Sequence, residues 1–177
     1  MHALQAEPFV KEVRITEAEW NDSIIVSARD DFGLFRRQIR PHMIWGWWTQ
    51  EVAWQLQRFY NDIVAGRRPK LAISAPPQHG KSWSATDFIA YVAGQMPDRK
   101  TIFGSYSDDL GVRINNDLQR IIMGEPFRRI FPGTRISDDT VTAASADRWK
   151  RNSSLIEFIN HEGSFRNTTV SGQINGL

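Results

Sequence analysis

The 177-residue sequence predicts an α/β fold, a mostly parallel sheet flanked by helices, with an N-terminal helical lead-in and a C-terminal β-hairpin. Two short apolar runs, residues 71–75 and 100–105, each precede a stretch of helical periodicity, which is the pattern of parallel strands joined by crossover helices. Two further strand-like runs, residues 154–159 and 165–170, flank a turn-rich segment and predict the hairpin.

The composition is that of a globular domain and limits the function only loosely. The chain is 41% hydrophobic and 24% charged, with a net charge of +2, a mildly basic balance that is compatible with nucleic-acid binding. The absence of cysteine excludes disulfides and thiolate metal sites. Because the chain has no signal-peptide pattern and no apolar run of membrane-spanning length, we expect no membrane partner.

The first part of the chain predicts helices. Thr16 and Glu19 form a capping-box pattern that opens a helix toward residue 28, and a short basic helix is predicted over 34–39. The arginines there are expected to form a solvated face, with contact to phosphates or partner acids as the alternative. A longer helix follows the tryptophans of 45–48, which we expect to serve mostly in packing. The arginines of the short basic helix and its end are Arg36, Arg37 and Arg40. The apolar face of the longer helix comprises Val52, Leu56, Phe59, Tyr60 and Ile63.

Two more helices follow the two predicted strands. The first has an apolar stripe that we expect to be its buried face. The second begins near Asp108 and Asp109, whose charges favour a helix N-terminus. The first stripe comprises Ala85, Phe88, Ile89, Val92, Ala93 and Met96, and the second comprises Leu110, Ile114, Leu118, Ile121 and Ile122.

One stretch, Leu71-Ala-Ile-Ser-Ala-Pro-Pro-Gln-His-Gly-Lys-Ser82, predicts a phosphate-binding loop. Its apolar run reads as a buried strand, and Gly-Lys-Ser then opens a helix, which is the context a P-loop requires. The match departs from the motif at Ala75, where the first glycine is expected. The residues predicted to bind a nucleotide are Pro76, Pro77, Gln78, His79, Gly80, Lys81 and Ser82.

The residue types of this loop suit ATP with Mg²⁺. Backbone N–H groups at a helix N-terminus point at a bound anion, and Gly80 allows a close approach. Lys81, the candidate catalytic residue, can reach the β- and γ-phosphates as a point charge. The hydroxyl of Ser82 can ligate the magnesium ion that bridges them.

Three blocks of the sequence together resemble one family. Residues 75–82 resemble the phosphate loop of the large terminase subunit, the DNA-packaging motor ATPase of tailed bacteriophages, where many members read close to A-P-P-R-H-G-K-S. Residues 105–110 are similar to the S-Y-S-x-x-L block of that family, followed by its helix and the closing Phe-Pro at 131–132. Residues 169–172 look like the stretch before the family's acidic strand. The resemblance covers roughly residues 45–177.

The resemblance implies a P-loop NTPase fold (ASCE, RecA-like), with residues 1–44 as the helical lead-in and 45–177 as a partial ATPase domain. It implies ATP hydrolysis coupled to translocation of double-stranded viral DNA into a procapsid, in the cytoplasm of the host cell. The implied partners are the small terminase subunit, the portal protein and further copies in a homo-oligomeric ring. DNA contact is then expected to be with backbone phosphates and independent of sequence.

Two departures from the family matter. Several members carry an arginine inside the loop, where this chain has Pro77 and Gln78. The family also has a strand ending in paired acids that hold magnesium and activate water, and none of the Asp-Asp pairs here, at 30–31, 108–109 and 138–139, follows an apolar strand. The chain thus resembles a terminase cut before that strand and before the nuclease domain. We expect weak ATP binding and poor turnover.

Other candidate residues lie outside the loop. Gln50 either reads the adenine edge, as an upstream glutamine does in the family, or is an ordinary helix-surface residue. Trp47 or Trp48 either stacks on the base or packs in the core. Ser105 and Tyr106 follow the second strand, where open α/β sheets bind ligands, and the resemblance implies DNA contact or coupling for them. The alternative is a helix cap by Ser107 beside a packed tyrosine.

Two other functions remain open. The chain is alternatively part of another nucleic-acid-dependent P-loop ATPase, such as a helicase, which would need a second motor domain. It is otherwise a non-catalytic remnant that only binds a partner. ATP binding separates the remnant from the two ATPases.

Overall fold

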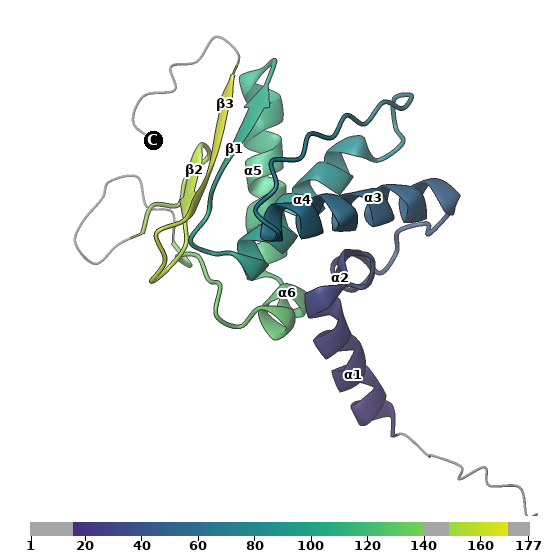
Figure 1. Ribbon diagram of the computed structural model, residues 1–177. Helices are drawn as coiled ribbons and strands as arrows, with labels where there is room; N and C mark the ends of the chain where they lie inside the picture. Colours follow the sequence, from purple (N-terminus) through teal and green to yellow (C-terminus); the bar gives the residue numbers. More distant parts are fainter. Residues whose placement is uncertain (1–15, 140–148, 170–177) are drawn as a thin grey trace, which may run out of the picture.

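The computed structural model describes residues 16–139 and 149–169, which form an α/β arrangement of six helices and one small sheet (Figure 1). All three described strands join that sheet, and the helices lie mainly to one side of it. The elements are α1 (Glu17–Asp30), α2 (Phe32–Ile39), α3 (Trp47–Val64), α4 (Lys81–Gln95), β1 (Lys100–Ser105), α5 (Asp108–Met123), α6 (Glu125–Ile130), β2 (Leu155–Glu157) and β3 (Ser164–Thr169).

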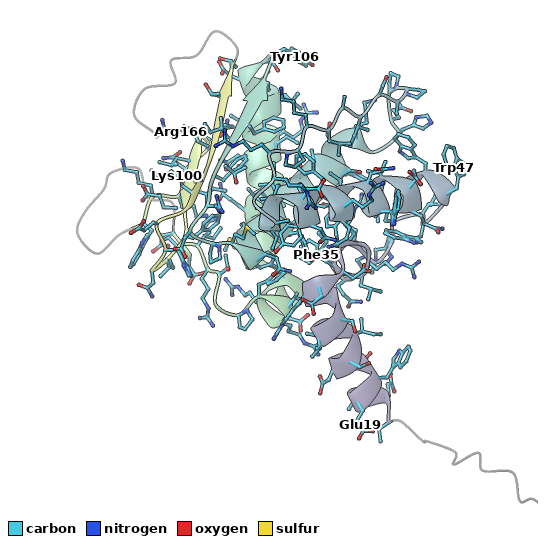
Figure 2. The ribbon with its side chains drawn as sticks, viewed as in Figure 1. Glu19, Phe35, Trp47, Lys100, Tyr106 and Arg166 are labelled. Atoms are coloured by element: carbon cyan, nitrogen blue, oxygen red, sulfur yellow. The ribbon has the colours of Figure 1, made fainter. Side chains whose placement is uncertain are left out.

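The sheet is mixed, with strand order β1-β3-β2. β1 and β3 run parallel with Lys100 opposite Ser164, and β2 pairs antiparallel with β3, so the predicted hairpin is confirmed. Asn160 in its turn has a φ of 63°, a left-handed conformation that asparagine adopts more readily than most residues. α5 packs on one face of the sheet, and Lys100 and Arg166 lie toward the other face (Figure 2). Residue 170 of the predicted strand lies outside the described residues.

The prediction of a buried strand at residues 71–75 is wrong. The segment forms no strand, and the side chains of Leu71 and Ile73 are 40% and 36% exposed. An apolar run becomes a buried strand only where neighbouring strands pair with its backbone, and none of the described strands does so. The α/β class is therefore correct, but the described sheet is smaller than expected and mixed rather than mostly parallel.

Two predicted helix starts, those of α1 and α5, are confirmed, whereas the short helix predicted from residue 34 begins at Phe32. The backbone N–H of Glu19 donates to the Thr16 hydroxyl at 3.2 Å, and the backbone N–H of Thr16 donates to the Glu19 carboxylate at 2.8 Å, which is a complete capping box. The Ser107 hydroxyl caps α5 by accepting from the backbone N–H of Leu110. These contacts form within four residues of sequence, which is why local patterns predict them.

The core centres on aromatic rings from α2, α4 and α6. Phe32 and Phe35 of α2 each lie 5.4 Å, centroid to centroid, from Tyr91 of α4. Phe35 also contacts Phe127 of α6 and Phe131, and all five rings are buried. The Tyr91 hydroxyl donates to the Arg29 carbonyl at 2.9 Å, so this buried polar group is satisfied.

Three charged side chains form a group that joins α4 to α2 and to Arg40, the residue just after α2. Asp87 is fully buried, and its carboxylate accepts from Nε of Arg36 at 3.0 Å and from Nε of Arg40 at 2.7 Å. Arg36 is 2% exposed, so the prediction that these arginines form a solvated face is wrong for it. Burial raises the pKa of Asp87, and the two guanidinium groups oppose that rise.

The buried face of α4 also differs from the predicted stripe. Asp87, Ala90 and Tyr91 are fully buried because α4 packs against α2, α3 and α5. Phe88 and Ile89 of the predicted stripe are half-buried. They line a shallow cavity of about 210 Å³ together with the exposed apolar segment at residues 71–75. The stripe therefore faces the segment that was predicted to be a strand.

We predict that Asp87→Asn lowers the free energy of unfolding by about 3–5 kcal/mol, because it leaves two desolvated guanidinium groups without a counter-charge. Urea unfolding followed by circular dichroism measures this loss. Asp62→Asn is the control, because Asp62 pairs with Arg67 at the surface and its loss is expected to cost less than about 1 kcal/mol. Equal losses in the two variants would contradict the structural role of Asp87.

We also predict a loss of stability at alkaline pH that depends on Tyr91. Burial raises its pKa to about 12, whereas an exposed tyrosine has a pKa of about 10. Since the folded state holds this proton more tightly, the stabilisation is fully present below about pH 10 and is lost as the pH rises through about 12. Urea unfolding across this range should show a shallower decline for Tyr91→Phe than for the wild type. Equal declines in the free energy of unfolding for the wild type and Tyr91→Phe would refute the prediction. Tyr106→Phe is the control, because the ring of Tyr106 is exposed.

Candidate functional site

The predicted phosphate loop has the backbone shape of an anion-binding turn. Gly80 is the N-cap of α4 with a φ of 72°, and Gln78 has a φ of 66°. Left-handed residues thus lie on both sides of His79, and left-handed turn residues are typical of the backbone concavities that bind anions. The first intrahelical bond of α4 runs from the backbone N–H of Ser84 to the Gly80 carbonyl at 2.9 Å. The N–H groups of residues 81–83 therefore remain available to an anion.

Lys81 folds back against this loop. Its ammonium group donates to the carbonyl oxygens of Ala75 and Pro76, the latter at 2.8 Å. The positive charge consequently lies beside the loop and close to the helix N-terminus. An anion at the loop would compete with these two carbonyls for the ammonium group, and a triphosphate offers the stronger, charged acceptors.

Ser82 is the residue of this loop that fits a magnesium ion. It is the second residue of α4, next to Lys81, and its side chain is exposed. Magnesium commonly keeps several waters and binds through few protein ligands plus substrate phosphates, so one hydroxyl suits it. Among the described residues, no three His, Cys, Asp or Glu side chains gather into a metal-binding group. Any ion here would thus depend on the oxygens of a bound phosphate.

Most of the predicted loop residues line one surface cavity of about 510 Å³. Two of the predicted residues, Pro76 and His79, do not line it. The Pro76 carbonyl accepts from the Lys81 ammonium, and His79 lines the neighbouring cavity described below. Trp83 joins the lining although sequence reasoning did not select it; its place directly after Gly-Lys-Ser was the available signal. The lining consists of Pro77, Gln78, Gly80, Lys81, Ser82 and Trp83.

A second cavity, of about 530 Å³, lies between the start of α3, Arg36 of α2 and the loop. Trp48 connects the two sides, because its indole N–H donates to the His79 carbonyl at 2.8 Å. The neighbouring rings of Trp47 and Trp83 also line it. We name this space the indole cavity. Trp47 is 78% exposed, so the expectation that it serves in core packing is wrong, and both Trp47 and Trp48 lie beside the predicted loop.

The remaining predicted site residues lie elsewhere. Gln50 is exposed, is not among the residues lining the indole cavity, and donates its amide to the Trp45 carbonyl at 3.1 Å. Ser105 is buried, and its hydroxyl donates to the Ser107 carbonyl at 2.7 Å. Tyr106 is 85% exposed at the carboxyl end of β1 (Figure 2). The packed tyrosine considered as an alternative is therefore wrong, whereas the Ser107 cap is present.

Comparison of this chain with protein-family models, with curated proteins and with solved structures finds no significant match. Within the described residues, no helix has both the length and the apolar character needed to cross a membrane. The loop and the two cavities beside it are therefore the features of this chain that indicate a function.

We predict that Gly80→Ala lowers the free energy of unfolding by about 1–2 kcal/mol, because a side chain at a φ of 72° is strained although no atom stands within 4 Å of the added carbon. Gly133→Ala is the matched control, since it has equally open space without a positive φ, and it should change stability by less than about 0.5 kcal/mol. Thermal unfolding compares the pair. A Gly80 variant as stable as the control would contradict the left-handed turn.

Proposed function

We propose that this chain binds the triphosphate of ATP at the loop of residues 76–82, as part of the ATPase of a bacteriophage large terminase subunit. The observation that carries the proposal is the combination at the start of α4. There, a left-handed Gly80 and uncapped helix N–H groups lie at one exposed cavity, and Lys81, which also lines it, donates its ammonium to the Pro76 carbonyl beside the loop. A neutral ligand would leave this concentration of donors without charged acceptors.

The proposed fold is a P-loop NTPase domain. It is supported by the parallel pairing of β1 with β3 and by the helix that begins directly after the loop. The segment at residues 71–75, which forms no strand, leads directly into the loop.

Within the proposed reaction, the residues of this chain bind and orient the triphosphate. The loop N–H groups hold the phosphate oxygens, and Lys81 offsets the negative charge shared by the β- and γ-phosphates. Magnesium, when bound beside Ser82, supplies further charge neutralisation. Phosphoryl transfer also needs a carboxylate that positions water, and no acid among the described residues lines the loop cavity. We therefore propose binding with poor turnover for this segment alone.

In the intact protein, the proposed function is translocation of double-stranded DNA into a procapsid by a ring of copies that contacts the portal protein and the small terminase subunit. The mildly basic charge of the chain suits contact with DNA phosphates. Tyr106, which is 85% exposed after the carboxyl end of β1, is accessible to DNA or to a partner.

Titration calorimetry with Mg²⁺ and ATP, and separately with Mg²⁺ and inorganic triphosphate, tests the proposal. We expect Lys81→Ala to weaken both ligands about 10- to 100-fold, the effect of removing charge-assisted hydrogen bonds. Lys70→Ala is the control, because Lys70 is an exposed lysine shortly before the loop, and it should bind as the wild type does.

Equal affinity in the Lys81 and Lys70 variants would refute a P-loop. A wild-type chain that binds neither ligand would favour the non-catalytic remnant. A steady ATPase rate that disappears on Lys81→Ala would contradict the expectation of poor turnover.

A further inference from the structure

The indole cavity has the shape and lining of a site for a flat ring. Its volume of about 530 Å³ is within the range of small-ligand pockets. Trp47 is 78% exposed and Trp83 is 52% exposed, although large aromatic side chains are usually mostly buried. The rings of Trp47 and Trp48 meet at 81°, with centroids 6.1 Å apart, so a flat ligand stacked on one indole meets the other edge-on.

The wall of this cavity contains an unsatisfied hydrogen-bond donor. Arg36 lines the cavity and is 2% exposed, yet its Nη1 has no acceptor among the described residues. Its Nη2 donates only to the sulfur of Met43 at 3.4 Å, a weak acceptor. A buried donor without an acceptor costs free energy, which a ligand carrying an acceptor would recover with a small shift of the guanidinium group.

The start of α3 adds more donors to the same cavity. Its N-cap is Gly46, which makes no side-chain capping bond, and the first intrahelical bond belongs to the N–H of Gln50. The N–H groups of residues 47–49 are therefore uncapped within the part of the chain that is described. None of the described residues lining the cavity is an Asp or Glu. A ligand that suits this wall is aromatic and presents acceptor atoms.

The indole cavity and the phosphate-loop cavity adjoin. Gln78, Gly80 and Trp83 line both, so one ligand with a ring at one end and an anion at the other can occupy the two together. A nucleotide has this form. Indole rings stack on bases with little preference for sequence, because every base has a π-face.

We propose that the indole cavity holds a purine base, stacked on an indole and held through ring acceptors by Arg36, and that it accepts guanine as well as adenine. The proposal rests on the proposed triphosphate site. Adenine and guanine both present ring-nitrogen acceptors to a guanidinium group. Gln50, the amide that sequence reasoning assigned to adenine, is engaged with the Trp45 carbonyl instead. A site selects strongly between two purines only if binding the wrong one leaves a buried polar group without a hydrogen bond. The donor here, Nη1 of Arg36, can be satisfied by either purine.

Titration calorimetry with ATP, GTP, CTP and inorganic triphosphate, each with Mg²⁺, tests the proposal. We expect ATP and GTP to bind within about tenfold of each other and CTP to bind more weakly, because a pyrimidine stacks over less area. Trp47→Ala should weaken ATP and GTP about 5- to 100-fold, the effect of losing one base-stacking contact, and leave triphosphate unchanged. Trp54→Ala is the control, because Trp54 is 54% exposed on the same helix and does not line the cavity.

A second variant tests the donor. Arg36→Lys retains a positive charge near Asp87 but removes the guanidinium fork, and it should weaken ATP and GTP while sparing triphosphate. Circular dichroism and thermal unfolding show whether this variant folds. If it does not, Trp47→Ala decides, since its exposed side chain makes little contribution to the core.

The outcomes separate this proposal from the triphosphate site. If triphosphate binds but ATP and GTP bind no more tightly, or if Trp47→Ala changes nothing, the base site is refuted and the phosphate loop stands. A preference for ATP over GTP greater than about 100-fold overturns the shared-acceptor argument. If triphosphate does not bind, titration with adenosine alone decides: quenching of tryptophan fluorescence that is lost in Trp47→Ala supports the cavity, and no quenching refutes both sites.

Discussion

The described structure depends on one buried carboxylate. Asp87 accepts from Arg36 and Arg40, and so joins the helix that follows the phosphate loop to the helix whose arginine lines the indole cavity. Its two oxygens are occupied by donors from α2 and the residue just after it. This contact fixes how α4 lies against α2, and therefore where Gly80 and Trp83 stand relative to the wall of the cavity. Loss of Asp87 would leave both guanidinium groups desolvated and without a counter-charge, which is why the contact constrains the fold strongly.

The elements predicted correctly are those whose causes are local. The capping box of α1, the Ser107 cap of α5 and the hairpin around Asn160 each depend on residues a few positions apart. The start of α4 directly after Gly80 belongs to the same class, because the glycine and the helix start are adjacent in sequence. Local patterns thus predicted most helices, all three described strands and the position of the candidate site.

The features that were missed depend on contacts between distant parts of the chain. Arg36 and Asp87 are separated by 51 positions, and neither residue type signals burial, so an exposed arginine was the reasonable expectation. Leu71–Ala75 has the composition of a strand, but pairing decides whether a strand forms. The indole cavity likewise unites α2, α3 and α4. The sequence offered Trp47 and Trp48 as stacking candidates but did not indicate that Arg36 and Trp83 would join them.

The central claim is that the turn around Gly80 binds the triphosphate of a nucleotide, and backbone amide chemical shifts test it most directly. On addition of Mg²⁺ and inorganic triphosphate, the largest changes in an ¹⁵N–¹H correlation spectrum should fall on the amides of residues 78–83, where the N–H groups meet the anion. Changes confined to exposed basic residues such as Arg67 and Lys70, with the loop amides unmoved, would contradict the claim.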